Sequence, residues 1–269
     1  MPTTSPRFAL NHITAPRLAP EAFFALAGEL GLDAVEIRND LAGNAILDGT
    51  PAARIRALAE AAGVRILSIN ALQRFDDWRA DRANQAVALA DYAAACGAEA
   101  LVLVPTNDDS RPDRLLAALE GLKAILQGRG LRGLVEPLGF ASSSLRLKSA
   151  AADAIRAVGG GDTFRLVHDT FHHHLAGESA LFPQLTGLVH ISGVDNPDVA
   201  TDDMRDADRV LVTGRDRLGN LPQIRALREG GYGGYLSFEP FAAEVQALDD
   251  PRDALRASMA LVQAGILPA

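Results

Sequence analysis

Short apolar runs alternate along the chain with longer runs in which apolar residues recur at helical spacing. The short runs are rich in β-branched and aliphatic residues and predict buried strands at 8–13, 33–38, 64–69, 100–104, 132–136, 164–169, 187–192 and 235–240. The periodic runs predict helices near 20–30, 51–62, 79–96, 112–128, 149–158, 178–185, 221–229 and 251–265. Several end in a glycine, as a left-handed C-terminal cap favours: Gly31, Gly63, Gly97 and Gly130.

Eight strand–helix pairs in 269 residues give a mean repeat of about 34 residues (269 divided by 8). No linker or shift in composition divides the chain. This pattern predicts an α/β fold, a single (β/α)8 barrel that forms one domain over residues 1–269. An open, doubly wound sheet is the structural alternative. It would place a glycine-rich phosphate loop after the first strand, where the chain instead reads NHITAPRLAP (11–20).

Polar side chains stand at the ends of the last four predicted strands: Glu136, Asp169, His190 and Glu239. Strand C-termini surround the mouth of a barrel, where active sites lie. Because strand side chains alternate between faces, the residues two positions earlier should line the barrel interior. All four of these are small or apolar: Leu134, Val167, Leu188 and Ser237. The alternation therefore predicts that three carboxylates and one imidazole share one mouth.

Three carboxylates that converge without a cation repel one another and are pushed toward protonation. A divalent metal removes this conflict, and an O/O/O/N ligand set suits Mn²⁺, Mg²⁺, Co²⁺ or Zn²⁺. Each residue alone has a structural explanation, as a helix cap, half of an ion pair or a hydrogen-bonded core histidine. Their joint occurrence on four successive strands favours a metal site.

The stretch VHDTFHHHL (167–175) holds four of the six histidines of the chain. Asp169 is its candidate metal ligand. His172 follows three residues later, and this spacing returns it over the same mouth. His168 alternates outward toward the helices and is expected to be structural, whereas the last two histidines of the stretch point elsewhere.

Four other polar residues are candidate substrate contacts. His12 ends the first strand, and Lys148 lies in the segment after the fifth, where simple solvation is the alternative role. Arg38 shares a strand face with Glu36, so the two could instead pair with each other. Arg209 lies in a long charged loop, 193–219, and long loops on the catalytic face of a compact barrel usually have a function.

The composition of the chain limits the classes of partner that it is expected to bind. The formal net charge of −8 disfavours nucleic acid, and no apolar run is long enough to cross a membrane. The single cysteine, Cys96, cannot form an intramolecular disulfide, and the first residues lack the apolar segment of a signal peptide, so a cytoplasmic location is expected. The expected partner is a small polyol ketone or sugar, and a homo-oligomer is compatible with the sequence.

Five stretches in order, LVEPLGF, LVHDTFHHHLAGE, GLVHISGV, DADRVLV and SFEPF, resemble the xylose-isomerase-like barrels and, within that superfamily, the inosose (2-keto-myo-inositol) isomerases. The resemblance implies one divalent metal on Glu136, Asp169, His190 and Glu239. It also implies that His172 and Arg209 contact substrate oxygens, although Arg205 is close enough to take the arginine's place.

The implied activity is a metal-dependent isomerase or epimerase of ketoses or inososes that works through a cis-enediolate. Glu136 and Glu239 would then be the acid–base pair. An inosose dehydratase or another sugar epimerase of the superfamily stays open, because a dehydratase shares the first step and His172 could protonate its leaving hydroxyl. A barrel that binds a polyol without turnover is the alternative of another class.

Overall fold

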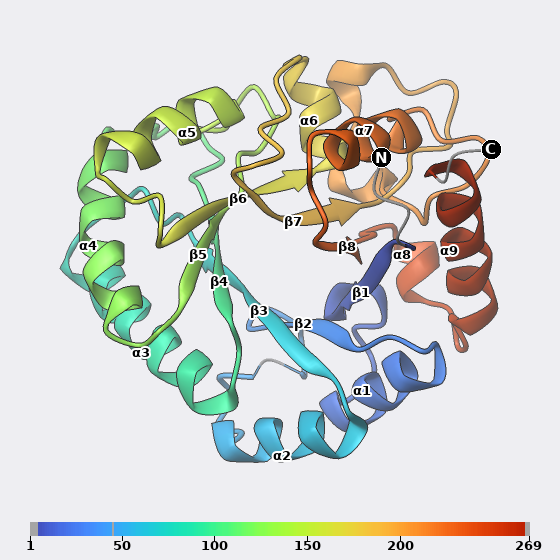
Figure 1. The fold of residues 1–269 in the computed structure, drawn as a ribbon, viewed down its shortest axis with the longest axis horizontal. Coiled ribbons are helices and arrows are strands. Elements are labelled where there is room, and N and C mark those ends of the chain that lie inside the picture. Colours follow the sequence, from blue (N-terminus) through green and yellow to red (C-terminus); the bar gives the residue numbers. More distant parts are fainter. Residues whose placement is uncertain (1–4, 45, 267–269) are drawn as a thin grey trace.

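A computed structural model describes residues 5–44 and 46–266 of the chain. Eight parallel strands pair in chain order, and the last pairs with the first, so that the sheet closes into a barrel (Figure 1). The strands are β1 (Arg7–Asn11), β2 (Ala34–Arg38), β3 (Arg65–Gln73), β4 (Ala100–Val104), β5 (Arg132–Val135), β6 (Phe164–Asp169), β7 (Thr186–Ile191) and β8 (Tyr235–Phe238). The predicted (β/α)8 barrel is confirmed.

Helices form a ring around the strands (Figure 1). They are α1 (Pro20–Glu29), α2 (Ala52–Ala62), α3 (Ala80–Cys96), α4 (Leu115–Gln127), α5 (Lys148–Ala157), α6 (Thr170–Ala176), α7 (Asn220–Glu229), α8 (Ala243–Gln246) and α9 (Arg252–Ile266). Gly63 and Gly97 close α2 and α3 with φ values of 68° and 82°, which glycine adopts without a steric cost.

One predicted helix, 178–185, is wrong. The helix that follows β6 is α6, which begins directly after the strand because the Asp169 carboxylate accepts the backbone amides of Phe171 and His172 at 2.7 and 3.0 Å. Gly177, with φ of 64°, ends it. The apolar run mistaken for a helix contains Pro183 and packs against the core without helical structure.

Several strand boundaries also differ from the prediction, and those of β1 and β3 bear on the site. β1 ends at Asn11, and a 3₁₀ turn, η1 (His12–Thr14), follows it. β3 runs on to Gln73, which places Asn70 inside the strand.

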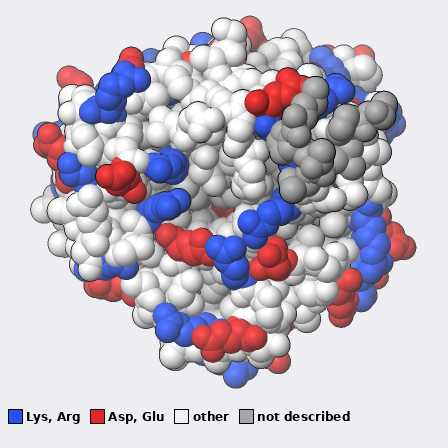
Figure 2. All heavy atoms as spheres, viewed as in Figure 1, with Lys and Arg blue, Asp and Glu red and all other residues white. Residues whose placement is uncertain are grey.

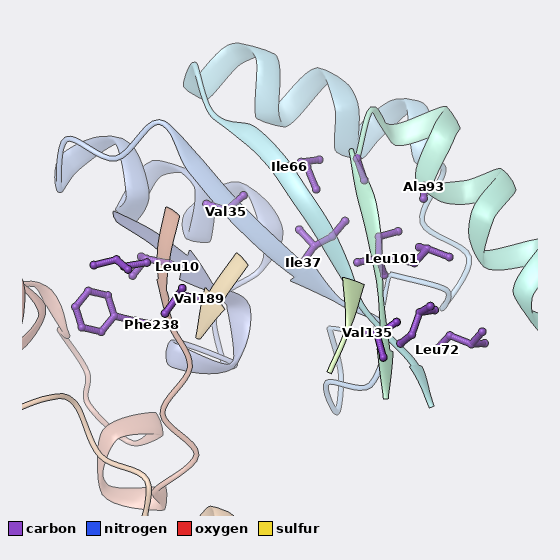
Figure 3. Close-up of a cluster of buried hydrophobic side chains, with 14 of the residues drawn as sticks. Leu10, Val35, Ile37, Ile66, Leu72, Ala93, Leu101, Val135, Val189 and Phe238 are labelled. Carbon is purple, nitrogen blue, oxygen red and sulfur yellow. The ribbon is translucent and has the colours of Figure 1, made fainter. Parts of the chain in front are cut away.

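The core has two layers. Outward-facing strand residues pack against the helices, and in Figure 3 Leu101 of β4 lies beside Ala93 of α3. Inward-facing residues form a separate cluster inside the barrel, which includes Leu134, Val167 and Leu188. These are three of the four residues that alternation placed there.

The described part of the chain contains no helix with both the length and the apolarity that a bilayer crossing requires. Acidic and basic side chains are interspersed on the face shown in Figure 2, around a hollow at its centre.

Candidate metal centre

Four side chains converge at the C-terminal end of the barrel: Glu136, Asp169, His190 and Glu239. Each offers one ligand atom, and these atoms all lie within 4.8 Å of one another. All four side chains are buried. The structure thus brings together the strand-end residues that the sequence singled out, because each points inward one layer above the apolar interior of the barrel.

His190 is held between two sets of carboxylates. Its Nδ1 lies 2.8 Å from Glu136 Oε1 and 3.2 Å from Glu239 Oε2, on the side where the possible ligand atoms gather. Its Nε2 lies 3.1 Å from Glu36 Oε1. The Glu36 carboxylate also accepts hydrogen bonds from two hydroxyls, that of Ser237 at Oε1 and that of Ser68 at Oε2. A metal-binding histidine commonly donates its second ring N–H to a carboxylate in this way.

Two arginines contact the same cluster. Arg209 Nη2 donates to Asp169 at 2.6 Å and to Glu239 at 3.0 Å. Arg38 Nη1 donates to Glu239 at 3.0 Å, while its other nitrogens bind Asp40 at 2.8 Å. Glu36 and Arg38 share a strand but bind different partners, so the suggested pair between them does not form.

The two glutamates that face the cavity have pKa values that move apart. Burial raises the pKa of Glu136, and the charge of Glu239 adds to this, against the lowering effect of His190. Burial acts upward on the pKa of Glu239 as well, but His190 and Arg209 together hold it well below its usual range. The two neighbouring carboxyl groups therefore have pKa values shifted in opposite directions, an arrangement suited to acid–base chemistry.

A cavity of about 380 Å³ opens above the cluster. Its lining includes five predicted site residues: Arg38, Glu136, His172, Arg209 and Glu239. Asp169 and His190 do not line it, and Asp169 instead lines a small neighbouring cavity with His172. His172 is buried on α6, and its Nδ1 has no hydrogen-bond partner among the described residues. Arg209 is buried at the cavity, whereas the alternative Arg205 is exposed and outside its lining.

Two predicted substrate contacts do not line this cavity. His12 is fully buried in the turn after β1, where its ring stacks on Phe23 at 4.1 Å and its Nε2 hydrogen-bonds to the carbonyl of Leu18 at 2.8 Å. Lys148 is buried rather than solvated, and it lines a small separate cavity with Asp169 and His172. It starts α5, and its Nζ lies 2.7 Å from Nδ1 of His168, which faces the helices as expected.

Sequence reasoning missed the supporting polar residues. The sequence pattern predicts neither the contact of Glu36 with His190 nor that of Asn11 with Glu239. Asn11 and Asn70 each donate to Glu239 Oε1 at 3.1 Å. Strand alternation predicts only the direction of the Glu36 side chain, which points to the same side as Arg38. The contact of Glu36 with His190 depends on how the barrel closes.

The donor set fits a divalent cation. Three carboxylates and one imidazole are typical ligands of Mn²⁺, Zn²⁺, Mg²⁺ or Co²⁺, and their atoms are close enough to share one ion. The orientation of His190 by Glu36 supports the same use, because it leaves Nδ1 facing the other three ligands.

Comparisons with known proteins agree with this fold. A family model described as "Xylose isomerase-like TIM barrel" matches residues 24–264. The structure of a xylose isomerase domain-containing protein from Salmonella typhimurium LT2 is 33% identical, with a TM-score of 0.91, over 97% of this chain and 99% of that one. The structure of an IolI protein with a binding zinc atom is 19% identical, with a TM-score of 0.82, over 97% and 98% of the two chains.

An L-ribulose 3-epimerase structure is 16% identical, with a TM-score of 0.68, over 97% of this chain and 94% of that one. No curated protein sequence matches the chain.

Proposed function

The chain belongs to the xylose isomerase-like TIM barrel family, and from that premise we propose that it is a divalent-metal-dependent isomerase or epimerase of ketoses or inososes. The observation that carries the proposal is the convergence of Glu136, Asp169, His190 and Glu239 below a cavity large enough for one sugar ring. The zinc in the IolI protein and the activity named for L-ribulose 3-epimerase support the metal and the reaction class.

Glu136 and Glu239 are the acid–base pair of this proposal, because both line the cavity. One carboxylate removes the proton from the carbon beside the ketone, which leaves a cis-enediolate, and the other group returns a proton at the neighbouring carbon. A divalent metal held by the four side chains would stabilise the negative charge that develops on the substrate oxygens. His172 and Arg209 hold the substrate oxygens in place, and both line the same cavity.

Two alternatives rest on specific features. A dehydratase begins with the same proton removal and then expels a β-hydroxyl, and the imidazole of His172 is placed to protonate that leaving group. A barrel that binds a polyol without turnover is favoured by Arg209 and Arg38, which already supply positive charge to the carboxylates.

The cytoplasmic location of the protein and its assembly into a homo-oligomer stay predictions.

The test is deuterium exchange from D₂O into the carbon beside the ketone, with a panel of inososes and ketoses. We expect exchange with Mn²⁺-loaded protein and a loss of roughly 10³-fold or more after the metal is chelated. A dehydratase would instead produce the ultraviolet absorbance of a dione from scyllo-inosose. Equal exchange with and without metal would contradict the metal's role, and thermal stabilisation by these compounds without any exchange would support the binding protein.

A further inference from the structure

A second cavity, of about 810 Å³, adjoins the mouth cavity and holds none of the residues proposed for the isomerisation. The two cavities share three lining residues: Asn107, Phe140 and Asp206. The segment after β5, the end of α6 and the long loop after β7 wall the second cavity. Since the mouth cavity alone is in the size range of a small-molecule site, the second provides room that a single ring does not need.

One side of the second cavity is apolar. Leu175 and Met204 line it and belong to a buried cluster that also contains Phe171. Phe140 stands between the two cavities, with its ring centroid 5.1 Å from that of His172. A ligand that extends from the mouth into the second cavity would therefore pass an aromatic ring and rest on apolar side chains, as ligands in most small-molecule sites do.

The polar side of the second cavity has no net charge. Arg146 and Arg205 line it, and each donates to two backbone carbonyls at 2.8 to 2.9 Å, which holds the guanidinium groups in place. Asp202 and Asp206 line the same space. Two cations and two anions offer both donors and acceptors to hydroxyl groups, whereas a phosphate dianion would meet two carboxylates as well as two guanidinium groups and gain no net attraction.

We propose that the substrate is a ketose or inosose that carries a second, neutral sugar ring. The ketone-bearing ring lies beside Glu136 and Glu239, and the glycosyl group extends past Phe140 into the second cavity. This inference rests on the proposed function and deepens it by naming the substrate class.

The experiment compares D-fructose with two ketoses that carry a second ring, isomaltulose and lactulose, and with D-fructose 6-phosphate. Deuterium exchange beside the ketone is measured with Mn²⁺-loaded protein. We expect kcat/KM for a two-ring ketose to exceed that for D-fructose by about tenfold or more. Ala141→Trp fills the second cavity and should abolish this advantage without changing exchange into D-fructose, whereas Ala141→Ser, the matched control, should keep it.

Calorimetric titration with the same four compounds separates failure of this inference from failure of the proposed function. If D-fructose exchanges as well as the two-ring ketoses, or the phosphate is preferred, the inference is overturned while the proposed function stands. If none of them exchanges, tighter binding of a two-ring ketose that Ala141→Trp removes would still support the second cavity as a glycosyl site. Equal binding of all four, or none, would overturn it.

Discussion

Two buried histidines on adjacent strands, His168 of β6 and His190 of β7, have pKa values that move in opposite directions. Neither has any exposed surface, and burial alone lowers the pKa of both. At His190 the carboxylates of Glu239 and Glu36 outweigh burial, so its pKa rises well above the usual value. At His168 the ammonium of Lys148 acts in the same direction as burial, so its pKa falls well below that value.

The difference shows that burial does not decide whether an ionisable group is charged; the sign of its neighbours does. The region behind β6 collects bases, with the rings of His168 and His173 only 4.8 Å apart, and burial lowers the pKa of Lys148 to about 7. The mouth instead pairs acids with cations. Strand alternation produces both regions, because His168 points toward the helices and His190 into the barrel.

Glu239→Gln removes a carboxylate from the mouth and should have the largest effect. We expect deuterium exchange to fall about 10³-fold, equivalent to roughly 4 kcal/mol of transition-state stabilisation, because Glu239 is both a proposed ligand and half of the proposed acid–base pair. The matched control is Glu244→Gln, an exposed glutamate nearby on α8, which should keep full activity. Full turnover in Glu239→Gln would refute its assignment.

Arg209→Met removes a cation from the mouth. In metal-free protein the free energy of unfolding in urea should fall by about 3–5 kcal/mol, because Asp169 and Glu239 both lose a buried partner. Saturating Mn²⁺ should restore part of this loss, since ligand binding stabilises the folded state. The exposed Arg205→Met should change stability by no more than about 0.5 kcal/mol. Equal losses in the two variants would show that Arg209 does not neutralise the cluster.

Lys148→Met tests the region behind β6, where Lys148 and His168 meet. The pKa of Lys148 is about 7 in the folded protein, below its value of about 10.4 in an unfolded chain. Between these values the unfolded state binds more protons, so wild-type stability should rise with pH, relative to the variant, by at most about 1.4 kcal/mol per pH unit. Below pH 7 the difference between the two proteins should become constant.

Chemical denaturation of wild type and Lys148→Met between pH 6 and 9 measures this slope. Lys123→Met, at the protein's other lysine on α4, is the control and should follow the wild-type pH dependence. A constant difference across the range would show that Lys148 stays charged.

Glu36→Gln should have the smallest effect, because Glu36 is not one of the four proposed ligands and supports one of them, His190. The affinity for Mn²⁺, measured by calorimetry, should weaken by about 10- to 100-fold as the imidazole loses the carboxylate that orients it. Glu21→Gln, on the exposed side of α1, should leave the affinity unchanged. An unchanged affinity of Glu36→Gln for Mn²⁺ would show that Glu36 does not support metal binding.

The sequence was sufficient to predict the barrel and the four strand ends, because strand periodicity and alternation are local properties. It could not place the side chains of Lys148 and His12, which follow strand ends and take directions that the next turn or helix sets. The apolar run at 178–185 led to a wrong helix prediction, because the pattern did not reveal that Asp169 caps a helix directly after β6. The role of Glu36 depends on a contact between β2 and β7, which no local pattern contains.

Asp169 divides its two oxygens between separate tasks. Oδ1 accepts the amides of Phe171 and His172, while Oδ2 faces Arg209 and the other acidic side chains. An ion arriving at Oδ2 would draw electron density from the whole carboxylate and so alter both amide hydrogen bonds. The ¹⁵N chemical shifts of those two amides should therefore report the binding of an ion at Asp169, and they can be measured without a substrate.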